Sequence, residues 1–202
     1  MAAYDDLIAI QGFGTSHFHE IHHFDQCFEE LFENNPKYRK PEVYGYRGAK
    51  INDNIVNHII NKININVPQR QVAILCFGGN NITDGQRPED FFRHFERLVN
   101  HANVVENLHI MIVGLIPRPK TDEHTKSLFF KTNRLLNTLC EENKPKCTFV
   151  NVSKVLCENG EILTEFYAGR ENNQVHLNIH GARVLAKRIF NMVKNIPKAA
   201  FN

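Results

Sequence analysis

The chain has 202 residues, of which 42% are hydrophobic and 23% are charged, and its formal net charge is +2. This length suits one domain, so we expect a single domain over residues 1–202. The composition excludes a disordered tail or a fibrous repeat as the main content, and the small net charge does not by itself favour a polyanionic partner.

The first half of the chain alternates short apolar runs with amphipathic stretches, the pattern of strands and helices. In chain order we expect a strand at residues 7–10, a glycine-rich turn at 12–16, a helix carrying Ile21, Phe24, Phe28, Leu31 and Phe32, a strand at 42–46, a helix with isoleucines every four residues from 51 to 63, and a strand at 72–77. The last of these runs is continuously apolar, which is typical of a strand covered on both faces.

The second half continues the alternation. We expect a helix that starts at Pro88, a strand at 108–116, a long helix capped by Thr121, a strand at 148–152 and a last helix at about 178–195. Five strands alternating with five helices predict an α/β fold, a doubly wound and mostly parallel five-stranded sheet with helices on both faces.

Functional sites of such sheets lie beyond the carboxyl ends of the strands. The candidate residues then lie on the loops at 12–16, 45–48 and 78–81, and on the loop before the last helix, which carries His176. Ser16 offers a hydroxyl that a base can activate, and His176 is a base with a near-neutral ordinary pKa. Gly48 leaves room for a substrate oxygen at a backbone amide, and Asn80 is a neutral donor for an oxyanion.

These residues stand in four blocks that resemble the SGNH (GDSL-type) hydrolases. The blocks read Gly14-Thr15-Ser16-His17, Tyr46-Arg47-Gly48-Ala49, Gly78-Gly79-Asn80-Asn81 and Asn173-Gln174-Val175-His176-Leu177-Asn178, with Gly181 and Leu185 in the final helix. The resemblance covers the whole chain in order and implies the three-layer SGNH fold. It implies a serine esterase for small acyl esters, such as acetyl esters, that needs no metal or organic cofactor.

The resemblance also implies the role of each residue. Ser16 is the nucleophile and His176 the general base, while the amides of Ser16 and Gly48 and the side chain of Asn80 form the oxyanion hole. Three positions depart from the family pattern: Thr15 and Asn81 replace aspartates in supporting positions, and Asn173 stands at the triad-acid position.

The departure at Asn173 leaves three readings open. In a well-known serine protease the same Asp-to-Asn change costs on the order of 10⁴ in rate. Either a Ser16–His176 dyad works with a backbone carbonyl or with Glu171, or the enzyme is slow, or the protein is not an enzyme. Taken singly, Ser16 is a favoured helix cap, Asn80 and Asn81 are turn residues, and a lone histidine is more often structural.

The alternative function is an SGNH-fold module with a vestigial site that binds RNA or a protein partner. The chain resembles esterase-like domains of LINE-type retrotransposon first open-reading-frame proteins, and also the C-terminal domain of Oskar, which keeps the fold without the chemistry. Arg183, Lys187 and Lys194 on the final helix are the candidate phosphate-binding residues of this alternative.

Three further features concern metals, membranes and location. His19 and His23 share a helix face within the cluster His17, His19, His22 and His23, but no third ligand is positioned by sequence, so we expect no metal site. No segment approaches the roughly 18 apolar residues of a membrane span. The N-terminus carries Asp5 and Asp6 and no basic n-region, and the five cysteines form no CxxC pair, so we expect a cytoplasmic protein without disulfides.

Overall fold

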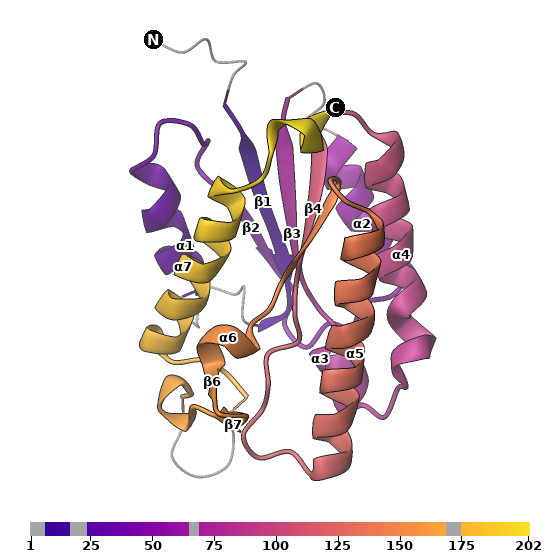
Figure 1. The fold of residues 1–202 in the computed structure, drawn as a ribbon, viewed down its shortest axis with the longest axis vertical. Coiled ribbons are helices and arrows are strands. Elements are labelled where there is room, and N and C mark those ends of the chain that lie inside the picture. The colour runs from indigo at the N-terminus through magenta and orange to yellow at the C-terminus, as the bar shows by residue number, and fades with distance from the viewer. Residues whose placement is uncertain (1–6, 17–23, 65–68, 169–174) are drawn as a thin grey trace.

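The computed structural model describes residues 7–16, 24–64, 69–168 and 175–202. Its centre is a five-stranded parallel sheet with the strand order β2-β1-β3-β4-β5 (Figure 1). The strands are β1 (Ala9–Gly14), β2 (Glu42–Gly45), β3 (Gln71–Cys76), β4 (Leu108–Val113) and β5 (Cys147–Val150). This order is that of a doubly wound sheet whose direction of winding reverses between β1 and β3, so the predicted fold class is confirmed.

Helices cover both faces of the sheet, which gives the three layers seen in Figure 1. One face carries α1 (Phe24–Glu33) and α7 (Ile179–Lys194), and the other carries α2 (Asp53–Asn64), α4 (Pro88–Val104) and α5 (Glu123–Glu142). Smaller elements that the sequence did not predict are α3 (Gly79–Thr83), α6 (Ser153–Leu156), the hairpin of β6 (Cys157–Glu158) and β7 (Glu161–Ile162), and the 3₁₀ helices η4 (Thr164–Phe166) and η5 (Lys198–Phe201). Most of them lie near the carboxyl ends of the strands.

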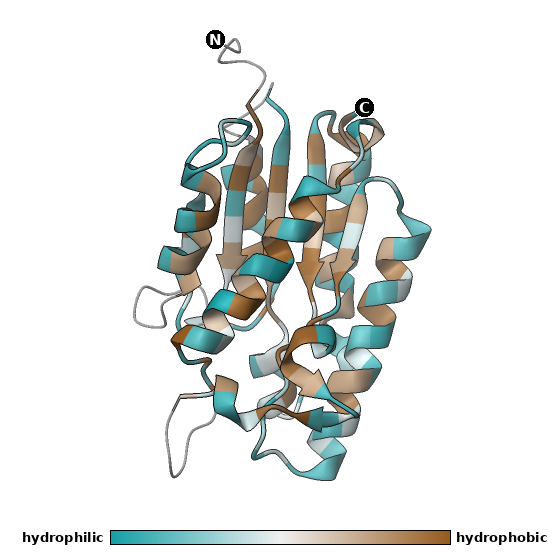
Figure 2. Ribbon diagram, turned by 60° about the vertical axis from the view of Figure 1, so that its left-hand side comes forward, coloured by the Kyte–Doolittle hydropathy of each residue, from teal (hydrophilic) through white to brown (hydrophobic). Residues whose placement is uncertain are grey.

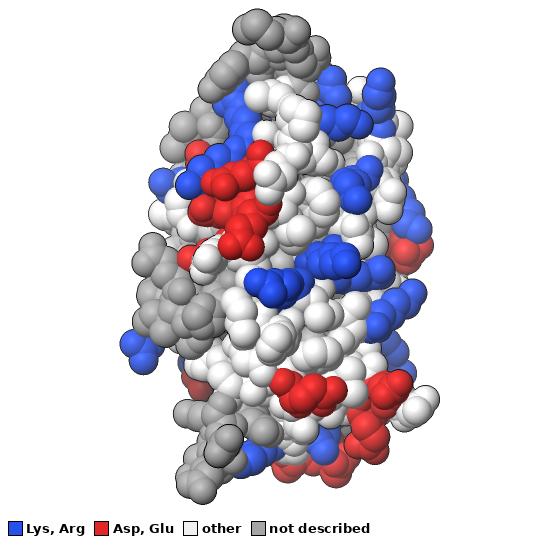
Figure 3. Space-filling view, turned by 90° about the vertical axis from the view of Figure 1, so that its left-hand side faces the viewer, with Lys and Arg blue, Asp and Glu red and all other residues white. Residues whose placement is uncertain are grey.

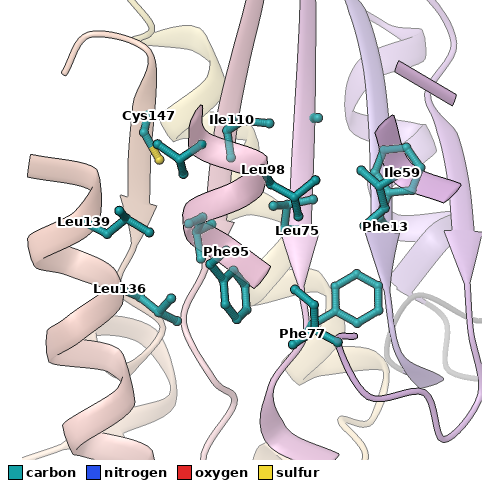
Figure 4. Close-up of a cluster of buried hydrophobic side chains, with 14 of the residues drawn as sticks. Phe13, Ile59, Leu75, Phe77, Phe95, Leu98, Ile110, Leu136, Leu139 and Cys147 are labelled. Atoms are coloured by element: carbon teal, nitrogen blue, oxygen red, sulfur yellow. The ribbon is translucent and has the colours of Figure 1, made fainter. Parts of the chain in front are cut away.

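Each face of the sheet has its own hydrophobic core. Along β3, Val72 and Ile74 point into the core under α1 and α7, while Ala73 and Leu75 point into the core under α2, α4 and α5. Figure 2 shows the apolar strands enclosed by helices whose outer faces are polar, and Figure 4 shows the second core. Cys76 is buried as predicted, and burial raises the pKa of its thiol to about 12.

The structure differs from several local predictions. The strand expected at 108–116 is Leu108–Val113, and the strand expected at 148–152 is Cys147–Val150. The first strand runs on through residues 12–14, which we expected to be a turn, because β2 and β3 pair with it on both sides as far as Gly14. The long helix is capped by Asp122 and not by Thr121: the Asp122 carboxylate accepts from Thr125 N at 2.9 Å, while the Thr121 hydroxyl donates to Arg118 O. Ile21 of the first predicted helix lies outside the described residues.

His109 on β4 makes stability depend on pH. Its ring is fully buried and its Nε2 lies 3.0 Å from Thr148 Oγ1, and burial lowers the pKa of His109 to about 4. The unfolded chain binds a proton near pH 6.5, so this contribution to stability is fully present above that pH and is lost as pH falls towards 4. We expect a loss of about 3 kcal/mol over this range in urea unfolding, and we expect His109→Leu to flatten the dependence. An unchanged slope in the variant would contradict this assignment.

Within the described part of the chain, none of the helices combines the length and the apolar character that a membrane crossing requires.

Candidate active site

Ser16 stands on the loop that follows β1, at the carboxyl edge of the sheet. Thr15 N, just before it, donates to Cys76 O on β3 at 3.2 Å. Tyr46 N, just beyond β2, donates to Gly14 O at 2.8 Å. Because both neighbouring strands hold this loop, the half-buried Ser16 lies at the point where the winding reverses, which is where such sheets bind ligands.

His176 lies on the loop before α7 and reaches Ser16 from the other end of the chain. Its Nε2 lies 2.8 Å from Ser16 Oγ, within hydrogen-bond range. The His176 carbonyl accepts from Ala168 N at 2.8 Å, and the next residue, Leu177, forms an antiparallel bridge with Tyr167. The structure therefore brings together a hydroxyl and an imidazole in the geometry that general base catalysis requires.

Asn178 fixes the direction in which the chain leaves His176. Its Oδ1 accepts from His180 N at 2.9 Å and from Gly181 N at 3.0 Å, which caps α7. Its Nδ2 donates to Glu165 O at 2.6 Å. One side chain thus joins the start of the helix to the segment that supports the His176 backbone.

Gly181 lets α7 pass close to that segment. A Cβ at this position would lie 2.3 Å from Phe166 O and 2.9 Å from Phe166 Cβ, so the backbone would have to move. We expect Gly181→Ala to destabilise the fold by about 1–3 kcal/mol, because the helix and the Phe166 backbone must move apart. Urea unfolding measures this effect. His180→Ala, at the exposed position before Gly181 on α7, is the control and should change the free energy of unfolding by less than about 0.5 kcal/mol.

Asn80 follows β3 in the first turn of α3. The residue before this helix, Gly78, has a φ of 104°, a left-handed conformation that glycine adopts readily. The Asn80 Nδ2 donates to Ala49 O at 3.0 Å, and its Oδ1 accepts from Arg118 Nη2 at 2.8 Å. A guanidinium can only donate, so this contact orients the amide and leaves Nδ2 as its donor end.

Gly48 lies in an exposed turn. The Asn80 side chain on α3 donates to the carbonyl of the next residue in this turn, Ala49. The turn is closed by Ala49 N donating to Tyr46 O at 3.1 Å, and Gly48 has a φ of 68°. A Cβ there would meet nothing within 4 Å, so glycine is favoured by backbone conformation rather than by lack of space. Gly48 is exposed, and the next residue, Ala49, contacts Asn80.

Arg118 lies beside the candidate site, although the sequence analysis did not place it there. Its side chain is half-buried and contacts Asn80 and Thr83. Burial lowers the pKa of Arg118. The position of Arg118 just beyond β4 could have indicated this contact. Because β4 lies beside β3 in the sheet, the loops that follow these two strands are neighbours.

Asn81, where the SGNH pattern has an acid, is a structural residue. Its side chain is 1% exposed, Oδ1 accepts from Ile51 N, and Nδ2 donates to Ile51 O and to Gln86 Oε1. A carboxylate cannot make these donations. The groups around Asn81 therefore accept hydrogen bonds from an amide, which explains why an asparagine rather than an aspartate stands here.

A cavity of about 260 Å³ opens beside Arg118. Its apolar walls include Leu115, Phe129 and Ile162, and its charged residues are Arg118, Glu123, Lys126 and Glu161. A smaller hollow shares Leu115 and Arg118 with this cavity and is also lined by Thr15 and Gly79, next to the Ser16 and Asn80 loops. Arg118 thus borders both the cavity and this hollow.

Some predicted residues lie outside the part of the chain that the structure describes, and others lie on α7. Asn173, Glu171 and the histidines at 17, 19, 22 and 23 lie outside the described residues. Arg183, Lys187 and Lys194 are exposed on α7, and Figure 3 shows basic side chains spread over this face beside a separate acidic patch. Their binding of phosphates stays a prediction. All five cysteines are free thiols.

Comparison with known proteins identifies similar chains. The sequence model of the GDSL-like lipase/acylhydrolase family matches residues 9–184. A member of the lipolytic protein G-D-S-L family from Veillonella parvula has a TM-score of 0.77 and 17% identity, covering 93% of this chain and 99% of that one.

Two further solved structures share the fold. The native aryl esterase of M. smegmatis has a TM-score of 0.70 and 11% identity, covering 95% of this chain and 100% of its own. A GDSL-like lipase from Bacteroides thetaiotaomicron has a TM-score of 0.69 and 12% identity, with coverages of 95% and 90%. No curated protein matches the chain.

Proposed function

Because the chain belongs to the GDSL-like lipase/acylhydrolase family, we propose that it is a serine esterase for small acyl esters such as acetyl esters. The observation that carries this proposal is the 2.8 Å contact between Ser16 Oγ and His176 Nε2. The two residues are 160 positions apart, and a purely structural role for either does not require their pairing at the carboxyl edge of the sheet.

The reaction begins when Ser16 Oγ attacks the ester carbonyl while His176 Nε2 takes its proton. The tetrahedral intermediate collapses to an acyl-enzyme, and the imidazolium gives its proton to the leaving alcohol. A water molecule, deprotonated by His176, then attacks the acyl group and releases the acid. The Ser16 and Gly48 amides and the Asn80 side chain donate to the oxyanion in both steps.

Active-site labelling tests this proposal directly. We expect a fluorophosphonate to form one adduct, mapped by peptide mass spectrometry to Ser16, and we expect release of 4-nitrophenol from 4-nitrophenyl acetate above background. Heat-denatured protein is the control. Labelling spread over several serines, together with no turnover, would favour the alternative of a vestigial site.

Because Asn173 stands at the triad-acid position, we expect the esterase to be slow. The SGNH resemblance places the triad acid here, and an amide stabilises an imidazolium less well than a carboxylate does. We expect Asn173→Asp to raise kcat for 4-nitrophenyl acetate by at least tenfold, part of the roughly 10⁴ that the reverse change costs in a serine protease. Asn191→Asp on α7 is the matched control. An unchanged kcat would mean that another group already orients His176.

An experiment can distinguish the alternative function, a module that binds RNA or a protein, from the esterase. Charge reversal at Arg183, Lys187 and Lys194 should weaken RNA binding in a gel shift if this surface is used, and should leave ester hydrolysis unchanged. The retrotransposon relationship and the cytoplasmic location likewise stay predictions from the sequence.

A further inference from the structure

Arg118 is a half-buried cation without a carboxylate partner among the described residues. It donates to two neutral acceptors, Thr83 Oγ1 at 3.1 Å and Asn80 Oδ1 at 2.8 Å. Asp84, whose charge acts on Arg118, is instead ion-paired with Lys50. Removing a guanidinium from water costs free energy unless an anion lies beside it. A bound anion would therefore stabilise the Arg118 guanidinium in this position.

The surrounding residues hold the guanidinium in place. A Cβ on Gly79 would lie 3.3 Å from Arg118 Nη2, so a larger residue at position 79 would crowd the guanidinium. The Arg118 guanidinium lies over the Phe129 ring, 5.9 Å from its centroid. The Tyr167 hydroxyl donates to Pro117 O at 2.6 Å and thereby joins the Arg118 loop to the segment that supports His176.

Arg118 lines the cavity of about 260 Å³, and its contacts with Thr83 and Asn80 leave other N–H donors of its guanidinium for a ligand. Two of the other charged residues of this cavity, Glu123 and Lys126, pair with each other at 2.6 Å. The hydrogen bond with Glu123 raises the pKa of Lys126, and the third charged residue, the exposed Glu161, adds to this effect. Arg118 is therefore the cation of this cavity that has no carboxylate partner among the described residues.

Resting on the esterase function proposed above, we propose that the substrate is a small ester that carries a carboxylate or phosphate group, and that Arg118 binds this anion. The guanidinium contacts Asn80 of the oxyanion hole, so the anion lies a few bonds from the ester carbonyl. The apolar walls at Leu115 and Phe129 suit a short carbon chain between the two groups.

Two matched substrate pairs test this specificity. The carboxylate pair is 4-nitrophenyl hydrogen glutarate and its neutral methyl ester, and the phosphate pair is 2-acetoxyethyl phosphate and its dimethyl ester. We expect kcat/KM to favour the anionic member of at least one pair by about tenfold or more, because charge-assisted hydrogen bonds are the stronger ones. Which pair shows the preference identifies the anion.

Variants of Arg118 separate anion binding from the support of Asn80. Arg118→Gln lowers turnover of both members of a pair. It should also reduce the ratio of kcat/KM for the anionic ester to kcat/KM for the neutral ester to about one, and Arg118→Lys should keep part of this preference. Arg134→Gln, on the exposed side of α5, is the control and should keep the full preference. A wild-type enzyme that hydrolyses neutral esters without preferring anionic ones would overturn the inference and leave the esterase standing.

If no ester is hydrolysed, a binding measurement tests whether Arg118 binds an anion. Calorimetry on Ser16→Ala should show binding of glutarate or inorganic phosphate, no binding of glutaramide, and loss of binding when Arg118→Gln is added. That result with an inactive wild type would retain the anion site and refute the esterase. Absence of binding and of turnover would refute both.

Discussion

Replacing Ser16 by Ala is expected to lower kcat for 4-nitrophenyl acetate by at least about 10³-fold and to abolish fluorophosphonate labelling. The reason is that Ser16 Oγ, which lies 2.8 Å from His176 Nε2, is the atom that forms the acyl-enzyme in the mechanism that we propose. Steady-state kinetics and mass spectrometry measure the two effects. Ser127→Ala, an exposed serine on α5, is the matched control.

The same prediction extends to His176, because the two residues act as a unit. His176→Gln should be about as damaging as Ser16→Ala, and the double variant should be no worse than either. Thermal unfolding of each variant shows whether the fold is kept. Additive losses would mean that the two residues contribute separately, and equal turnover in wild type and Ser16→Ala would remove Ser16 from the mechanism.

Asn80→Ala is expected to lower kcat by about 10²–10³-fold with a smaller change in KM, the usual effect of removing one oxyanion donor. Its amide is oriented by Arg118 on the oxygen side and by Ala49 O on the nitrogen side, so it is held ready before substrate binds. Asn103→Ala on the exposed face of α4 is the control. A proportional rise in KM with kcat unchanged would instead make Asn80 a substrate-binding residue.

Asn80→Asp sharpens this test. The carboxylate keeps the acceptor for Arg118 but cannot donate to an oxyanion, so its kcat should fall as far as that of Asn80→Ala. If Asn80→Asp retained activity, the role of Asn80 would be to hold Arg118 rather than to stabilise negative charge.

Much of the fold follows from local patterns. The run at 72–77 is apolar at every position because β3 is covered on both faces, and the predicted strands and helices all occur. One error arises where tertiary pairing overrides a local preference: Gly14 continues β1 because two neighbouring strands pair with it. The other is local, because two adjacent residues can both cap a helix, and it is Asp122 rather than Thr121 whose side chain accepts from Thr125 N.

By itself, the sequence determined the order of the elements and the residue types at the carboxyl edge of the sheet, including Ser16, Asn80 and His176. These follow from periodicity and from blocks of neighbouring residues, which are properties of short segments. Only the tertiary structure decided that Ser16 and His176 are hydrogen-bonded and that Arg118 contacts Asn80 beside a cavity. Distances between side chains on separate loops depend on how the strands are ordered and how each loop is held, and no local pattern encodes them.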